Sequence, residues 1–313
     1  LNASSHSSKV ASVCPMAITT KNFQILSDNQ LAWDLLTENC APCFVKGMPA
    51  PFFEYALTSS WMDCRLTYLN RFWLDDGKPV GFVYYESPVT NVFFSLLDGY
   101  EFLADEMIAY ADSTMPGKPG EKEFVLFPGQ TALMEAAKKL GYAEAYAYDD
   151  LLLDFSKTTL SRPLPEGYHF VEPADVDPVK LGACTWKGFN HEDKGPFENW
   201  DGEDPGTDWN PVKSYQGIIS SMMAPPPHST YEHEVIIADE TGEYVCYSGM
   251  WWVPENKLAY METLCTIPEY QHRGLAAAAL TAHYRRFKEK GGRFLTGGGN
   301  EFYRKIGYDT EVY

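Results

Sequence analysis

The segment TIPEYQHRGLAAAAL, Thr266 to Leu280, joins an apolar run to an alanine-rich stretch through a short polar loop. The apolar run is typical of a strand. The alanine-rich stretch predicts a helix from about Gly274 to Lys290, which the pair Gly291-Gly292 ends. The polar residues of the loop are therefore expected at the start of a helix.

The start of that helix has the properties of an anion site. The first turn of an α-helix has backbone N–H groups without intrahelical partners, at the positive end of the helix dipole. Gly274 and Ala276 would keep side chains away, so that a diphosphate could approach the backbone closely. His272 and Arg273 could add side-chain donors. The loop is therefore interpreted as a diphosphate site.

The chain has 313 residues, which favours two domains. No apolar run is long enough to cross a membrane, and the polar start LNASSHSSKVASVCP is not a secretory signal. We expect a cytoplasmic protein with no membrane partner. Residues 1–15 are interpreted as a disordered tail or an expression remnant, because Met16 is a suitable first residue.

The formal net charge of -18 disfavours nucleic acid as a partner and favours amine-bearing ligands. The odd number of seven cysteines, scattered along the chain, does not indicate a disulfide framework. The pair Cys40 and Cys43 has redox or metal-ligand spacing, but no second pair with zinc-site spacing accompanies it. We therefore expect no metal.

A stretch with Ser, Thr and Pro residues separates two strand-like runs and predicts a linker at 158–165. The linker divides the chain into domains at 16–157 and 166–313. The order of predicted elements is similar on both sides of it. DDGKPVGFVYYESP resembles ETGEYVCYSGMWWVP as a hairpin, and AAKKLGYAEAY resembles FYRKIGYDTEVY. These similarities favour duplication over chance repetition of strands and helices.

Two motifs of the second half resemble a known family. Gln271-x-x-Gly274-x-Ala276 follows a predicted strand, and Asn300-Glu-Phe-Tyr303-Arg-Lys-Ile-Gly-Tyr comes later. In this order the two resemble the acetyl-CoA-binding signature of the GNAT N-acetyltransferases. The resemblance implies an α/β (α+β) fold of two GNAT-like repeats, each a mixed, mostly antiparallel sheet flanked by helices. The motifs cover 166–313, whereas the first half is similar only in its architecture.

The resemblance also implies how acetyl-CoA would bind. The strand before the loop would splay from its neighbour and pair with the pantetheine arm through the backbone of Leu264, Cys265 and Thr266. Asn300 would bond the cofactor arm. The diphosphate would contact the backbone of the loop and the first helical turn, at Gln271, His272, Arg273, Gly274, Leu275, Ala276 and Ala277.

The chemistry needs a base for the attacking amine and an acid for the departing thiolate. Tyr303 matches the family's tyrosine near the sulfur and is the predicted acid. Glu262 is the predicted base, because a carboxylate on a central strand needs a reason to be there. A chain of water molecules stays open as an alternative base, with Glu232, His233 and Glu234 as further candidates. Cys265 is interpreted as a small apolar strand residue rather than a nucleophile.

The corresponding loop of the first half, Leu97-Asp-Gly-Tyr-Glu101, lacks the motif, and its acidic residues would repel a diphosphate. The first repeat is therefore predicted to be degenerate, with one active site per chain. The acidic, aromatic segment from His191 to Asn210 is expected to border the acceptor.

The predicted function is acetyl transfer from acetyl-CoA to a primary amine of a small molecule, by a monomer or homodimer. Two alternatives stay open. The first is a CoA-binding sensor or interaction module without turnover. The second is a member of the same fold that resembles mycothiol synthase or transfers an aminoacyl group.

Overall fold

The structure is a computed structural model that describes residues 17–312, except 60–61, 63, 87–90, 195–225 and 230. The predicted tail and most of the acidic segment expected to border the acceptor lie outside the described residues. So does a helix that the sequence favours at 212–223. Every structural statement below concerns the described residues.

An N-terminal unit is built on a five-stranded sheet with the order β1-β2-β3-β4-β5. Its neighbouring strands are antiparallel except β4 and β5, which are parallel. The hairpin predicted from DDGKPVGFVYYESP is confirmed as β2 and β3. The strands are β1 (Ile18–Asn22), β2 (Arg71–Asp75), β3 (Lys78–Glu86), β4 (Asn91–Leu96) and β5 (Glu123–Val125).

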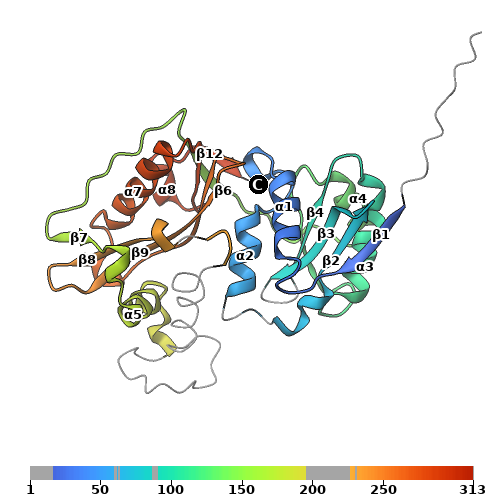
Figure 1. Ribbon diagram of the computed structural model, residues 1–313, viewed down its shortest axis with the longest axis horizontal. Helices are drawn as coiled ribbons and strands as arrows, with labels where there is room; N and C mark the ends of the chain where they lie inside the picture. Colours follow the sequence, from blue (N-terminus) through green and yellow to red (C-terminus); the bar gives the residue numbers. More distant parts are fainter. Residues whose placement is uncertain are drawn as a thin grey trace, which may run out of the picture.

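Four α-helices accompany this sheet. α1 and α2 pack on the face that turns toward the rest of the molecule, and α3 and α4 cover the other face (Figure 1). The helices are α1 (Asn29–Asn39), α2 (Ala50–Thr58), α3 (Ala104–Thr114) and α4 (Thr131–Lys139).

A C-terminal unit is built on a seven-stranded sheet with the order β12-β6-β11-β10-β9-β8-β7. Only the pair β10 and β11 is parallel. Both sheets are thus mixed and mostly antiparallel, as predicted. The strands are β6 (Asp150–Asp154), β7 (Tyr168–Phe170), β8 (Val235–Asp239), β9 (Tyr244–Val253), β10 (Leu258–Thr266), β11 (Phe294–Thr296) and β12 (Thr310–Val312).

The described α-helices of this unit are α5 (Pro178–Gly188), α7 (Leu275–Glu289) and α8 (Glu301–Ile306). α7 lies on one face of the sheet, where its buried alanines allow close packing on Val235 and Val245. α5 lies on the other face, against Cys265 and Tyr247. The helix predicted from Gly274 to Lys290 is confirmed within one residue at each end.

The position of β6 differs from the domain boundary inferred from sequence. Residues 150–154 were assigned to the first domain, but β6 lies between β11 and β12 of the second sheet. Leu153 pairs with Leu295, and Leu151 with Glu311. The apolar run Leu151–Leu153 is buried, and a sheet interior is the place where such a run is satisfied on both faces. The predicted linker at 158–165 therefore begins after a strand of the second sheet.

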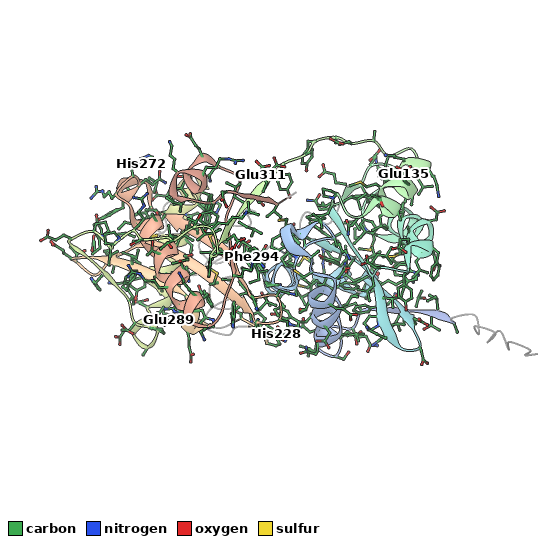
Figure 2. All side chains as sticks on the ribbon, turned by 90° about the horizontal axis from the view of Figure 1, so that it is seen from above. Glu135, His228, His272, Glu289, Phe294 and Glu311 are labelled. Atoms are coloured by element: carbon green, nitrogen blue, oxygen red, sulfur yellow. The ribbon has the colours of Figure 1, made fainter. Side chains whose placement is uncertain are left out.

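The two units share a buried core. Side chains of α1 and α2 pack together with Trp251, Val253, Leu258 and Tyr260 of the second sheet. A polar contact joins them as well: Nδ1 of His228 lies 2.6 Å from Oε1 of the buried Glu54. Figure 2 shows His228 where the two halves of the molecule meet. The interface is thus formed by apolar and polar groups together.

The helices of the described part are all too short or too polar to cross a membrane.

Candidate active site

β10 separates from β11 after a short stretch of pairing. The two strands pair at Leu258 with Phe294 and at Ala259 with Leu295. Beyond that point the amide of Met261 donates to the Thr296 hydroxyl at 2.6 Å. β10 nevertheless continues along β9 as far as Thr266. Within the described residues, the last part of β10 therefore has a strand partner on one side only. The other side faces the place where β10 and β11 diverge, which we call the notch.

The notch contains the three residues predicted to pair with a pantetheine arm, Leu264, Cys265 and Thr266. Their register with β9 is shifted by a bulge between Met261 and Leu264. A Cβ on Gly249, opposite the bulge, would overlap the carbonyl oxygen of Glu262. Glycine is therefore required where β9 passes the bulge, and the bulge sets the position of Glu262.

The loop after β10 leads to an uncapped helix start. Gly274 has φ 86 and is the N-cap of α7, and no described side chain caps the helix. The first helical bond runs from the Ala278 amide to the Gly274 carbonyl at 3.0 Å, which leaves the amides of the first turn without helical partners. Gly274 is exposed and Ala276 is half-buried. The backbone here is open to a ligand, as predicted for a diphosphate site.

The side chains of the loop mainly hold its shape. The Arg273 guanidinium donates to the Tyr168 hydroxyl at 3.2 Å and to the Glu269 carbonyl at 2.8 Å. It also lies 4.9 Å from the Tyr270 ring centre. Gln271 donates to the carbonyl of Thr266 at 3.2 Å. The charge of Arg273 is thus fixed beside the helix start, although two of its side-chain nitrogens donate to other residues of the protein.

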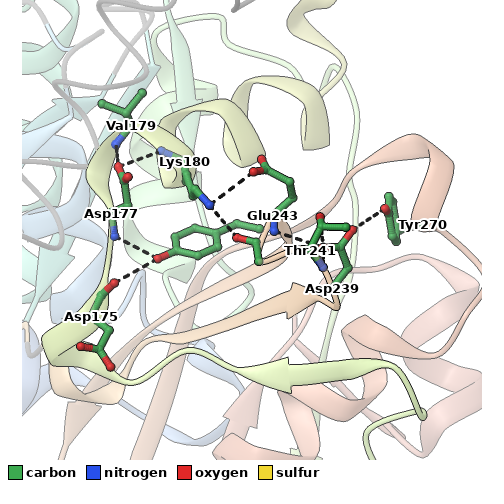
Figure 3. Close-up of polar contacts among 10 residues, drawn as sticks. Asp175, Asp177, Val179, Lys180, Asp239, Thr241, Glu243 and Tyr270 are labelled. Atoms are coloured by element: carbon green, nitrogen blue, oxygen red, sulfur yellow. Dashed lines mark hydrogen bonds and ion pairs between the residues drawn. The ribbon is translucent and has the colours of Figure 1, made fainter.

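The base of the loop is anchored to the turn between β8 and β9. The Tyr270 hydroxyl donates to Asp239 at 2.6 Å, and Asp239 also accepts bonds from Thr241 and from the amide of Glu243 (Figure 3). Burial alone would raise the pKa of Asp239, but these hydrogen bonds hold it at about 2. The carboxylate therefore stays ionised and keeps the loop in place.

Tyr303 lies at the other wall of the notch. It is 6% exposed, and its ring covers Gly297 and Gly298 so closely that a Cβ on either would clash. Its hydroxyl lies 3.8 Å from the Met261 sulfur. Asn300, the predicted ligand of the cofactor arm, is exposed, and its Oδ1 accepts the amide of Phe302. Asn300 therefore caps α8 and helps to position Tyr303.

Glu262 and Tyr303 are brought together. Burial, followed by the nearby carboxyl groups of Glu86 and Asp150, raises the pKa of Glu262 to about 8, although a hydrogen bond with Tyr55 opposes the shift. Burial, and to a lesser degree Glu262, raises the pKa of Tyr303. Glu262 is thus near enough to Tyr303 for its charge to affect the pKa of the phenol.

Three residues at this site were not found by sequence reasoning: Tyr55 on α2, Glu86 at the end of β3 and Asp150 at the start of β6. Burial raises the pKa of Glu86 to about 7 and also raises the pKa of Asp150. Two of the three belong to the N-terminal unit. A pattern within one repeat could not have indicated them.

The other candidates for the base lie in three different surroundings. Glu234 is buried next to the bulge, where a Cβ on Gly249 would lie 3.0 Å from its Oε2 and 2.8 Å from the Tyr247 hydroxyl. The ring of His233 packs on Phe287 of α7 instead. Burial and two cationic neighbours lower the pKa of His233 to about 4. Glu232 is exposed.

Cys265 faces α5. It is buried, and its sulfur lies 3.9 Å from the Cys184 carbonyl oxygen. A Cβ on Gly188 would lie 2.7 Å from the same sulfur. The thiol thus fills a gap between strand and helix, in keeping with the interpretation as an apolar strand residue.

The corresponding region of the N-terminal unit has its polar groups satisfied internally. The amide of Gly99 donates to the Glu101 carboxylate at 3.1 Å. Gln130, at the start of α4, donates to the carbonyl oxygens of Phe94 and Lys46 at 2.8 and 2.9 Å. In this unit, side chains of the protein itself bond a loop amide and a strand carbonyl.

Residues 186–308 match the family described as the acetyltransferase (GNAT) family. No curated protein matches the chain. Among solved structures, a GNAT-family acetyltransferase from Colwellia psychrerythraea is similar over 92% of this chain and 93% of that one, with a TM-score of 0.55 and 9% identity. A tandem GNAT protein from the clavulanic acid biosynthesis pathway is similar over 94% and 96%, with a TM-score of 0.51 and 10% identity.

A GCN5-related N-acetyltransferase from Sphaerobacter thermophilus is similar over 93% of this chain and 92% of that chain, with a TM-score of 0.50 and 12% identity. These similarities show the fold across most of the chain: mixed α/β, with two GNAT-like sheets flanked by helices. The family match lies within the C-terminal unit.

Proposed function

We propose that this protein transfers an acetyl group from acetyl-CoA to a primary amine of a small molecule. One observation carries the proposal. The unpaired edge of β10 leads directly into an exposed, uncapped helix start, and Glu262 and Tyr303 lie in the notch beside that edge. The edge of β10 offers backbone partners for the pantetheine arm, and the start of α7 offers a binding site for a diphosphate. Glu262 and Tyr303 would serve as base and acid.

Two parts of coenzyme A, the pantetheine arm and the diphosphate, have suitable partners in this arrangement. The backbone of Leu264, Cys265 and Thr266 would pair with the pantetheine amides in the manner of an added strand. The backbone from Gln271 to Ala277 would bind the diphosphate, because free amides and the helix dipole both favour an anion there. Asn300 would add a contact at the opposite wall.

The acid–base pair suits direct transfer. The amine nitrogen would attack the thioester carbonyl carbon and lose its proton to Glu262, directly or through one water molecule. The carbon–sulfur bond would then break, and Tyr303 would protonate the departing sulfur. Glu262 must be ionised and Tyr303 protonated at the start. Both states are available near pH 8, because the pKa of Glu262 is about 8 and that of Tyr303 is raised.

We also propose that the two units are tandem repeats and that the first has lost its cofactor site. Glu101 contacts the helix-start amide there, and Gln130 contacts the strand carbonyl. Counting back from Gly141 and Gly307, the N-terminal unit has Ala137 where the C-terminal unit has Tyr303. One active site per chain follows.

Two measurements test the function. Acetyl-CoA is expected to raise the melting temperature, and a panel of primary amines is expected to release free thiol from it. Glu262→Gln should keep the thermal shift and lose most of the thiol release. Stabilisation without thiol release for any amine would favour the CoA-binding sensor. No stabilisation would refute the cofactor assignment.

A further inference from the structure

Two strands from different sheets turn carboxylates toward one place. Side chains two residues apart on a strand share a face. Tyr84 belongs to the buried interface core, so Glu86 lies on the face of β3 that turns toward the C-terminal unit. Tyr260 belongs to the same core, so Glu262 lies on the face of β10 that turns toward the N-terminal unit. The two carboxylates thus lie at one end of the shared core.

A third carboxylate comes from β6. Leu152 belongs to the same core, which places Asp150 on the matching face at the strand's start. Asp150 accepts a hydrogen bond from the amide of Gly299, in the glycine run before α8. Its carboxylate thus has a structural partner in the wall of the notch.

The three carboxylates differ in what holds them. Glu262 has the Tyr55 hydroxyl, and Asp150 has the Gly299 amide. Glu86 is half-buried, and no hydrogen bond or ion pair reaches it from the part of the chain that the structure describes. A partly buried carboxylate without a partner is the arrangement that a cation stabilises most.

A neighbouring hydroxyl is also without a partner. Tyr84 is 1% exposed, and within the described residues its oxygen makes no hydrogen bond. It lies two residues before Glu86 on the same face of β3. Glu86 acts on it electrostatically, because that carboxylate, after burial, raises the pKa of the Tyr84 hydroxyl. A buried hydroxyl without a described partner is the kind of group that a bound ligand can complete.

We infer that the acceptor is a diamine whose second nitrogen, still protonated, is bound by Glu86 with help from the Tyr84 hydroxyl. This inference rests on the proposed function, since Glu262 would accept the proton of the attacking amine. The N-terminal unit thus supplies the specificity site and the C-terminal unit the chemistry. One carboxylate takes up a proton, and another offsets a charge that persists through the reaction.

The test compares 1,4-diaminobutane with n-butylamine, which has the same carbon chain and lacks the second cation. Calorimetry in the presence of saturating CoA measures binding of each amine without requiring turnover. Thiol release from acetyl-CoA gives kcat/KM for each. The diamine is expected to be preferred by about tenfold or more in both measurements. A series from 1,3-diaminopropane to 1,6-diaminohexane then maps the spacing.

The variants locate the second cation. Glu86→Gln should reduce the diamine preference to within about threefold of unity, because the amide keeps the shape and loses the charge. Tyr84→Phe should reduce the preference by a smaller factor. Glu255→Gln is the matched control. It removes a carboxylate from a separate groove of about 550 Å³ between the units, lined also by Trp33, His228 and Trp252, and should leave the preference intact.

The outcomes separate the two proposals. If 1,4-diaminobutane binds no better than butylamine, the inference is overturned, whether or not both are acetylated. The same holds if Glu86→Gln leaves the preference unchanged. If CoA binds, the diamine preference depends on Glu86 and no thiol is released, the cation site stands while the transferase function fails.

Discussion

In the N-terminal unit a carboxylate of the protein bonds the amide of Gly99, whereas in the C-terminal unit the corresponding Gly274 starts an exposed, uncapped helix. The two glycines have nearly the same backbone, with φ of 88 and 86. Glu101 follows the first glycine by two residues, and Ala276 follows the second by two. The loop amide of Gly99 is thus bonded by a side chain of the protein, whereas the first-turn amides of α7 have no described side-chain cap and could receive an anion.

The strands before these loops differ in the same way. Gln130 is 7% exposed and donates to the Phe94 carbonyl, while Asn300, also the N-cap of its helix, is exposed and caps α8. The longer Gln130 side chain therefore reaches a carbonyl group of β4, whereas the Asn300 side chain bonds an amide at the start of its own helix. If the N-terminal unit has lost a cofactor site, as we propose, the fold need not have changed, because the protein can satisfy its own polar groups.

The largest expected effect is a loss of turnover when a carboxylate of the C-terminal unit is changed, but not when one of the N-terminal unit is changed. Glu262→Gln keeps the side-chain shape but removes the proton acceptor, so kcat/KM should fall by about 10²- to 10⁴-fold, with CoA affinity retained. Thiol release and calorimetry measure the two quantities. Glu101→Gln changes a carboxylate of the N-terminal unit and should leave turnover unaltered. Equal losses in both variants would contradict the assignment of one active site.

The pH dependence of kcat/KM should reflect the ionisation of Glu262. Because the pKa of Glu262 is raised to about 8, the group is mostly protonated at pH 6, and kcat/KM should rise about tenfold per pH unit well below that value. The amine contributes a rise of its own. In Glu262→Gln, kcat/KM should therefore still rise with pH, but the slope of log kcat/KM against pH should be smaller by one. Identical slopes in the two proteins would exclude Glu262 as the base.

Ala276→Glu should make the second loop resemble the first. The new carboxylate can reach the Gly274 amide as Glu101 reaches Gly99, so CoA should bind about tenfold more weakly or worse. A first-turn glutamate suits the helix dipole, and the fold should stay intact. Calorimetric titration with CoA measures the change. Ala276→Gln, which lacks the charge, should weaken CoA binding less. Equal effects of the two variants would argue against electrostatic binding of the diphosphate at this helix start.

A pair of matched changes should give smaller effects. Gly99→Ala and Gly274→Ala both force a left-handed residue to carry a Cβ, and each should destabilise the protein by about 1 kcal/mol in urea unfolding. Only Gly274→Ala should also weaken CoA binding, by a few-fold. A loss of CoA affinity in Gly99→Ala would show that the first loop takes part in binding.

The smallest effect concerns stability. Burial raises the pKa of Glu234 to about 8, above its ordinary value. Its protonated form therefore favours the fold below pH 5, and this contribution is lost as the pH rises toward 8. The melting temperature should fall over that range by several degrees more in the unaltered protein than in Glu234→Gln. Parallel melting curves against pH would refute the shift.

The helix start was predictable from sequence because its signals are local. Gly274 and the alanines after it determine where α7 begins, and the long hairpins contain their own turn residues. The sequence also draws attention to Glu262, since a carboxylate within an apolar strand is a conspicuous departure from the pattern. Its role as the base stays a prediction.

The remaining wall of the site was not predictable from sequence. Tyr55 and Glu86 come close to Glu262 because the two units share a core, and Asp150 does so because β6 joins the second sheet. Contacts between such distant segments leave no local signal. The contact of Gln130 with Phe94 was hidden for the same reason, whereas that of Glu101 with Gly99 is local. Their residue types suggested a poor anion site but did not show which group they would bond.

The place of β6 affects any attempt to dissect the molecule. A fragment beginning at residue 166 would lack the strand between β11 and β12, so that β12 would lose its only described neighbour and β11 would become an edge. Asp150 would be removed with it. A fragment meant to carry the C-terminal fold must therefore start before Asp150, and the reciprocal fragment should stop there.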